Sequence, residues 1–390
     1  MPVINTIADR HDEMTAWRRH LHTRPELGFE EHMTAEFIAE KLKEFGVEVH
    51  LGMAGTGVVG VIRGQGESDR MIGLRADIDA LPITEENDFE HASQHFGRMH
   101  ACGHDGHTTM LLGAAQYLAE TRNFDGTAVL IFQPAEEGGG GGEVMLKDGL
   151  FDKFPVDTVW GLHNWPGLDV GKVVVQREAS MAAADVFNLT ITGKSGHAAM
   201  PHTTIDPIIV GTAIVDAYQT IVSRRVDPLD PAVVSVTQFH AGTTHNVIPD
   251  TAEITGTVRY VRKETGAFIA ERLRELATSI ASAHGCTISF DWEYGYPPTI
   301  NHAAEAERAA SVMEQVLGPQ SVVFDAPPSM ASEDFSYMLE ARPGAYIWLG
   351  SGAGGQGKML HNAGYDFNDE LLPLGASYWV QLVESELPRP

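Results

Sequence analysis

The sequence predicts an α/β protein: a three-layer domain with a mostly parallel sheet, into which a ferredoxin-like α+β domain is inserted. Helix and strand patterns alternate from the N-terminus to Phe132, which is typical of a three-layer domain. Between residues 184 and 296 the order becomes β-α-β-β-α-β, the order of a ferredoxin-like unit. A chain of 390 residues is also long for one core. We therefore expect one domain from residues 1–183 and 297–390, and a second from residues 184–296.

The first domain begins with two expected helices. Residues 7–22 are amphipathic, and residues 34–45 form a second helical pattern that Gly46 closes. Strands are expected at residues 47–50, 57–63, 71–75 and 127–132, and a helix runs from Asp105 to Ala119 before the last of these strands. In such sheets ligands bind at the carboxyl edge of the strands, so the residues that follow these strands are the candidates for a site.

The expected elements of the inserted domain begin with a strand. Residues 185–192 alternate between apolar and polar side chains, as a half-buried strand does. A glycine-flanked loop at 193–202 follows, and then come the remaining elements: a helix at 206–224, strands at 232–240 and 251–261, a helix at 264–283 and a strand at 286–293. The turn Tyr296-Pro-Pro298 leads back to the first domain.

The composition indicates which classes of binding partner and which cellular compartment to expect. The net charge of -26 argues against nucleic acid and anionic membranes, because both require a basic surface. Only Cys102 and Cys286 are present, which is no disulfide framework. No secretory pattern follows the N-terminus, and no apolar stretch approaches transmembrane length. We expect cytoplasmic residence by default.

Two short segments carry most of the chemical information. One is His100-Ala-Cys-Gly-His104-Asp-Gly-His107, and the other is Gln133-Pro-Ala-Glu136-Glu137-Gly, which ends an apolar run and leads into glycines. A thiol and imidazoles beside carboxylates suit a divalent transition metal. A spare carboxylate next to such a metal suits a hydrolase that activates water.

Each piece also has an ordinary explanation when it is taken alone. A single Cys-x-His pair rarely binds metal, and adjacent glutamates usually lie on a solvated face. His163 and His361 would singly be ordinary core or surface histidines. The glutamates, however, follow a buried strand pattern and precede a glycine tract, which indicates a tight turn rather than a surface helix. The combination therefore favours a metal site.

With these residues in view, the chain resembles the M20 metallopeptidase superfamily, in particular its aminoacylase branch of hippurate hydrolases and auxin-conjugate amidohydrolases. The resemblance covers essentially the whole chain. Its motifs lie in order at residues 18–27, 73–82, 100–107, 133–138, 196–202, 245–249, 332–335 and 360–362.

The resemblance implies a centre of two divalent metal ions. Its ligands would be Cys102, His104, Glu137, His163 and His361, with Cys102 as the bridge. Zinc or manganese suits this mixed set best, and cobalt or nickel would also fit. Glu136 would carry a proton from the attacking water to the leaving amine. Asp79 would orient a ligand histidine, and Asp77 would either do the same or cap a loop.

The inserted domain would complete the site by acting as a lid and dimerisation domain. The resemblance implies a homodimer, or a tetramer, in which His197 of one subunit polarises the scissile carbonyl in the other, with Asn246 beside it. For His202 and Arg259 two interpretations remain open. Each would either contact the substrate or serve a structural or solvent-facing role.

The predicted function is therefore metal-dependent cleavage of N-acyl-amino acids, of hippurate-like or N-acetyl type, into a carboxylic acid and a free amino acid. Two alternatives are a dipeptidase or carboxypeptidase of the same superfamily, and a non-catalytic protein that metal only stabilises. The non-catalytic alternative predicts a closed ligand shell without a base, whereas this sequence has Glu136 in addition to the expected ligands.

Overall fold

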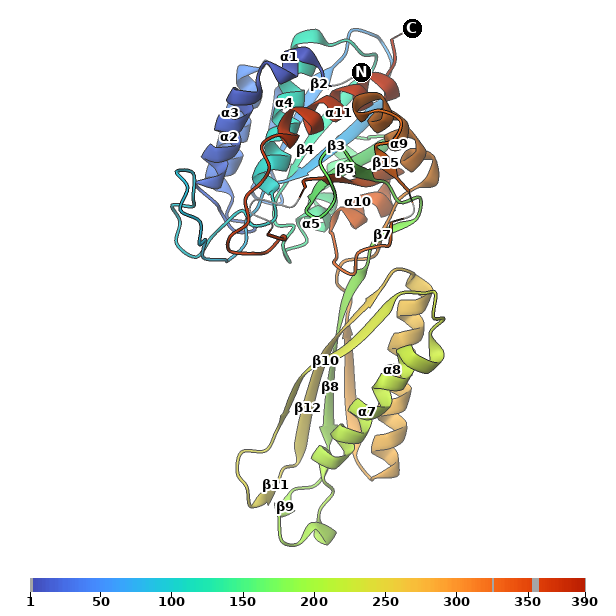
Figure 1. The fold of residues 1–390 in the computed structure, drawn as a ribbon. Coiled ribbons are helices and arrows are strands. Elements are labelled where there is room, and N and C mark those ends of the chain that lie inside the picture. Colours follow the sequence, from blue (N-terminus) through green and yellow to red (C-terminus); the bar gives the residue numbers. More distant parts are fainter. Residues whose placement is uncertain (1–2, 325, 353–357, 390) are drawn as a thin grey trace. The chain divides into compact units, whose positions relative to one another are not determined.

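The structure is a computed structural model that describes residues 3–324, 326–352 and 358–389. The chain divides into two compact units (Figure 1). Unit 1 comprises Met1–Glu178, Ile300–Pro327 and Asp334–Pro390. Unit 2 comprises Ala179–Thr299 and the short segment Pro328–Glu333.

Unit 1 is built on an eight-stranded sheet with the order β1-β2-β4-β3-β5-β16-β6-β15. The strands are β1 Glu48–Met53, β2 Gly57–Arg63, β3 Met71–Asp77, β4 Thr127–Gln133, β5 Thr158–Trp165, β6 Val173–Val174, β15 Val322–Val323 and β16 Gly344–Gly350. The central strands β4, β3, β5 and β16 run parallel, while β1 and β2 form an antiparallel edge. The predicted mostly parallel sheet is confirmed.

The described helices of unit 1 cover both faces of this sheet. They are α1 Asn5–Ala8, α2 His11–His22, α3 His32–Glu44, α4 His104–Thr121, α5 Gly141–Lys147, α6 Leu150–Lys153, α9 Ala303–Leu317, α10 Phe335–Ala341 and α11 Leu371–Glu386. Adjacent residues of a strand point to opposite faces. Leu74 of β3 belongs to the apolar core shared with α4 and α11, whereas Arg75 faces Phe335 of α10. These opposite contacts define the three layers.

The prediction of one helix over residues 7–22 was wrong in detail. The helix is divided, because α1 ends at Ala8 and α2 begins at His11. The intervening turn brings the Arg10 guanidinium to 2.7 Å from the carboxylate of Glu120 on α4.

Unit 2 has the ferredoxin-like order that the sequence predicted. Its four-stranded sheet has the order β10-β12-β8-β13, with every neighbouring pair antiparallel. The elements are β8 Ala183–Thr192, α7 Pro207–Arg225, β10 Ala232–Ala241, β12 Thr251–Tyr260, α8 Lys263–Ala283 and β13 Thr287–Glu293. Phe187, Leu189 and Ile191 of β8 point into a core that includes Ile214 of α7 and Leu273 of α8. The period-2 pattern of β8 therefore marks its buried face.

Unit 2 also carries small elements at its loops: β9 Gly196–His197, the 3-10 helix η1 Pro201–Thr203 and β11 Val247–Ile248, with β7 Ala179–Met181 and β14 Thr299–Ile300 at its start and end. Across the described part of the whole chain, none of the helices combines the length and apolarity that a membrane crossing requires.

Candidate metal centre

The candidate residues gather at the carboxyl edge of the parallel strands. Asp77 is the last residue of β3, Gln133 is the last of β4, and His163 lies near the end of β5. Because these strands are parallel neighbours, their ends meet at one edge. The segments that follow β3 and β4 bring Asp79 and Glu136 to the same place.

A glycine turn places the first ligand candidates at the start of α4. Gly103 has φ 95, a left-handed conformation that favours glycine, and it separates Cys102 from His104, the first residue of the helix. A Cβ on Gly103 would lie 2.3 Å from Asn164 Oδ1, so a side chain here would collide with the strand end. Cys102 and His104 are both buried.

A second tight turn presents the two glutamates. Ala135 has φ 51, which is strained for a residue with a side chain. The backbone N–H of Glu137 donates to Asp79 Oδ2 at 2.9 Å. The other oxygen of Asp79 lies 3.2 Å from His104 Nδ1. Asp79 therefore connects the turn to His104, in the position that an orienting carboxylate would take.

The structure brings the five predicted ligands together. Cys102 Sγ lies 3.4 Å from His163 Nε2, and His361 Nε2 lies 3.1 Å from Glu137 Oε1. Two of the groups whose donor atoms lie within 4.8 Å of one another are Cys102 with Glu137 and His361, and His104 with Glu136 and Glu137. His361 is half exposed and has φ 61, and its backbone N–H donates to Ala101 O at 2.8 Å. This bond holds the distant C-terminal loop beside Cys102.

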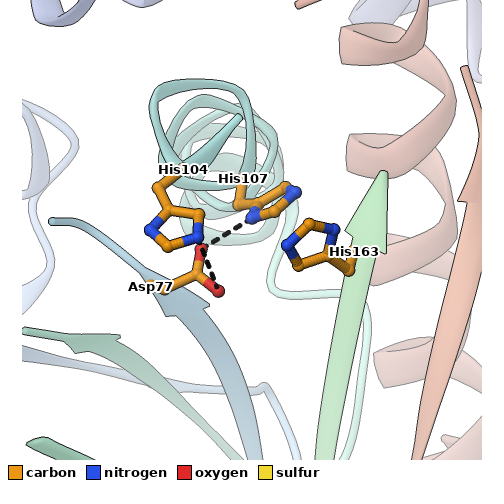
Figure 2. A group of neighbouring side chains, drawn as sticks. All are labelled: Asp77, His104, His107 and His163. Carbon is orange, nitrogen blue, oxygen red and sulfur yellow. Dashed lines mark hydrogen bonds and ion pairs between the residues drawn. The ribbon is translucent and has the colours of Figure 1, made fainter. Parts of the chain in front are cut away.

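His107 was missed as a site residue by sequence reasoning. Figure 2 shows it among Asp77, His104 and His163, whose donor atoms also lie within 4.8 Å of one another. His107 Nδ1 lies 2.6 Å from Asp77 Oδ1, and Nε2 lies 2.6 Å from Asn164 Oδ1. A signal was present, because His107 is three residues after His104 and therefore on the same side of α4.

Asp77 does more than cap a loop. Besides meeting His107, it accepts a hydrogen bond of 2.6 Å from Arg75, a buried guanidinium. Arg75 also donates to Asp334 at 3.0 Å, and Asp334 in turn accepts from the backbone N–H of Gly142 at 2.8 Å. A charged residue within the buried strand β3 was the available signal for this network, and sequence reasoning had passed over it.

The charges of the site fit a cation. Burial, together with Glu137, Glu136 and Asp77, raises the pKa of Cys102 well above its ordinary value. Three carboxylates beside one thiol suit a bound dication, which would lower the pKa of the thiol and favour the thiolate. His104 Nε2 is buried and has no hydrogen-bond partner among the described residues. Burial and His107 hold the pKa of His163 well below its usual range, which favours the neutral imidazole that binds metal. The residues present therefore fit a metal centre.

The four predicted residues of the inserted domain lie in unit 2. His197 pairs with Val247 across the small β9–β11 sheet, and the backbone N–H of Ala198 donates to Asn246 O at 3.0 Å, so His197 and Asn246 are neighbours. His202 is exposed on η1. Arg259 is half-buried on β12 and donates to Ser332 Oγ at 3.4 Å. Their roles at the metal centre remain predictions.

Peptidase family M20/M25/M40 matches residues 73–385. The chain is 43% identical over 382 residues to the hippurate hydrolase of Campylobacter jejuni, covering 98% of each chain. It is 47% identical over 295 residues to an N-acyl-L-amino acid amidohydrolase of Geobacillus stearothermophilus, covering 74% of this chain and 78% of that protein.

A solved structure is similar throughout. It is a dinuclear metal-binding peptidase of the M20 family from Bacillus subtilis, 35% identical, with a TM-score of 0.87 and coverage of 97% of this chain and 99% of that chain. The resemblance inferred from the motifs is confirmed. The chain belongs to the peptidase family M20/M25/M40.

Proposed function

We propose that this protein is a metal-dependent amidohydrolase that cleaves N-acyl-amino acids into a carboxylic acid and a free amino acid. The observation that carries the proposal is Glu136, a buried carboxylate that shares a site with His104 and Glu137. Both glutamates reach this group of donor atoms, and Glu137 also lies 3.1 Å from His361, so we assign Glu137 as a ligand and Glu136 as the base. The named activities of the relatives, hippurate hydrolase and N-acyl-L-amino acid amidohydrolase, support the same reaction class.

In this mechanism, Cys102, His104, Glu137, His163 and His361 would hold two divalent ions, zinc or manganese in the first place and cobalt or nickel as alternatives. When bound, such ions supply a water of lowered pKa and polarise the amide oxygen. The carboxylate of Glu136 accepts a proton from the water while the oxygen of that water attacks the carbonyl carbon of the amide. Glu136 then delivers that proton to the amine nitrogen as the C–N bond breaks. Asp79 holds His104 and the turn at residues 135–137, here called the glutamate turn, in fixed positions relative to each other.

A substrate panel tests the proposal. N-acetyl- and N-benzoyl-amino acids and long-chain acyl-amino acids should be hydrolysed by the apo-protein restored with each metal, whereas dipeptides with a free α-amino group should be poor substrates. The measurement is release of free amino acid for each pair of metal and substrate. A strict requirement for a free α-amino group would favour the dipeptidase alternative, and metal-dependent stability without any turnover would favour the non-catalytic one.

The inserted unit supports an assembly in which subunits pair. Strand β10 lies at one end of the four-stranded sheet and is partly exposed, with Val233 and Phe239 each 36% exposed. An edge of this kind invites pairing with a second chain. We propose a homodimer, or a tetramer built from it, in the cytoplasm, with His197 acting on the partner subunit's substrate beside Asn246. His202 and Arg259 are further candidates for substrate contact.

The His197→Ala variant should bind metal and dimerise normally, yet its turnover should fall about 10²-fold or more, as for the loss of an oxyanion-stabilising donor. The measurements are metal content, sedimentation and steady-state kinetics. Thr203→Ala, which changes an exposed residue of the neighbouring 3-10 helix, is the comparison variant for a structural effect of the loop.

Mixing inactive His197→Ala and Glu136→Gln subunits should then restore activity, because one site of each mixed dimer would have both residues intact. A strictly monomeric enzyme with full activity at nanomolar concentration would remove the role in the partner's site, and His197 would act within its own chain or only structurally.

A further inference from the structure

A buried carboxylate outside the proposed ligand set reaches the glutamate turn. Glu31 is fully buried and stands immediately before α3. A carboxylate at that position commonly caps its own helix. Glu31 makes no such capping bond. Glu26 caps the helix instead, because it accepts from the backbone N–H groups of Met33 and Thr34 at 3.1 and 2.8 Å.

Both oxygens of Glu31 bind other parts of unit 1. Oε1 accepts from the backbone N–H of Ala135 at 2.8 Å. Oε2 accepts from the hydroxyl of Thr56 at 2.6 Å, in the turn between β1 and β2. Glu31 therefore joins the start of α3 to the residue directly before Glu136.

Ala135 is a residue whose conformation requires support. It is buried, and its φ of 51 lies in the left-handed region. Strained backbone of this kind persists where surrounding contacts fix it. A further hydrogen bond fixes Ala135, because its carbonyl accepts from the Gly141 N–H at 3.1 Å. Gly28 also packs closely against Ala135, since a Cβ at Gly28 would lie only 3.0 Å from it. Without Glu31, the Ala135 N–H would lose the acceptor that holds it in a buried position.

We infer that Glu31 is a positioning residue for the reaction: it fixes the backbone of Ala135 and thereby aims the Glu136 carboxylate. The inference rests on the proposed function, in which Glu136 is the base. Asp79 holds the other side of the same turn through the Glu137 N–H, so Glu136 lies between two backbone anchors made by two different carboxylates. Asp79 also contacts His104, whereas Glu31 has no ligand candidate among its hydrogen-bond partners in the described residues.

Because Glu31 holds the Ala135 side of the turn and Asp79 holds the Glu137 side, loss of Glu31 should affect kcat more than KM or metal content. Glu31→Ala should lower kcat about 10- to 100-fold, because a small misplacement of a reacting group has effects of this size. KM and metal content should change little, since Asp79 still anchors Glu137. Glu31→Gln should recover most of the activity, because its amide oxygen can accept from the Ala135 N–H and its amide nitrogen can donate to the Thr56 hydroxyl.

Glu26→Ala is the matched control, since Glu26 is a buried carboxylate in the same segment whose side chain caps only α3. It should lower the melting temperature without lowering kcat per folded, metal-loaded enzyme. If Glu31→Ala does not fold, Glu31→Asp serves instead, because it keeps the charge but is too short to make both contacts. Its kcat should also fall.

Three outcomes would overturn the inference: an unchanged kcat in both Glu31→Ala and Glu31→Asp, a loss of metal that accounts for the lost activity, or a Glu31→Gln variant as inactive as Glu136→Gln. The last would make the charge of Glu31, rather than its hydrogen bonds, the requirement. An active Glu136→Gln would remove the proposed base and this inference together. An inactive Glu136→Gln beside a fully active Glu31→Ala would overturn this inference alone.

Discussion

Glu136→Gln is expected to reduce turnover by about 10²–10⁴-fold while the protein keeps its metal, the range typical of a general acid–base group. Glutamine preserves the shape of the buried side chain but cannot take the proton from the attacking water. Metal content should stay at the wild-type level, because Glu137 and not Glu136 is the proposed ligand. Steady-state kinetics with elemental analysis of the same preparation measures both quantities.

Two comparison variants make this result interpretable. Glu137→Gln should lose metal as well as activity, since it removes a proposed ligand. Glu143→Gln changes a partly exposed glutamate of α5 that pairs with Lys147 four residues later, and it should leave both metal content and activity unchanged. If Glu136→Gln retained activity within a few-fold of wild type, the proton carrier would lie elsewhere and the roles of the two glutamates would be wrong.

Removal of the metal is expected to abolish turnover. Protein purified without chelator should contain two divalent ions per chain by elemental analysis, and chelation should remove the activity until metal is restored. The buried thiol of Cys102 lies beside the buried carboxylates of Glu136 and Asp77 and the half-buried carboxylate of Glu137, so we expect this cluster to require a bound cation. A fully loaded protein that held a single ion would contradict the two-metal centre.

Cys102→Ser tests the bridge itself. A serine hydroxyl is far harder to deprotonate than a thiol, so the variant should retain metal poorly during dialysis and lose activity with it. The chain offers a matched control, because Cys286 is its other cysteine and is likewise buried. Cys286→Ser should keep both metal and turnover. Equal metal retention in the two serine variants would exclude Cys102 as a ligand.

The sequence alone was sufficient for the fold class and for β3, β4 and α4, which position part of the site, whereas β5, which carries His163, was not among the expected strands. Period-2 alternation in β8 is a local pattern that reports which face of the strand is buried, and the apolar runs of β3 and β4 are local patterns that report burial on both faces. The segment from His100 to His107 was also found from local sequence, because its thiol and imidazoles lie within eight residues of one another. The split between α1 and α2 escaped prediction, because the turn coincides with a contact from Arg10 to Glu120 on another helix.

Only the tertiary structure decided which distant side chains support the site. Glu31 meets Ala135, Arg75 meets Asp334, and His107 meets Asn164 across long stretches of chain. No local pattern distinguishes Glu31 from Glu26, although one contacts the glutamate turn and the other caps a helix. Periodicity and motif spacing depend on neighbours along the chain, whereas these contacts depend on how helices pack against the sheet. A buried carboxylate acquires its partner only when that packing brings a backbone N–H within reach.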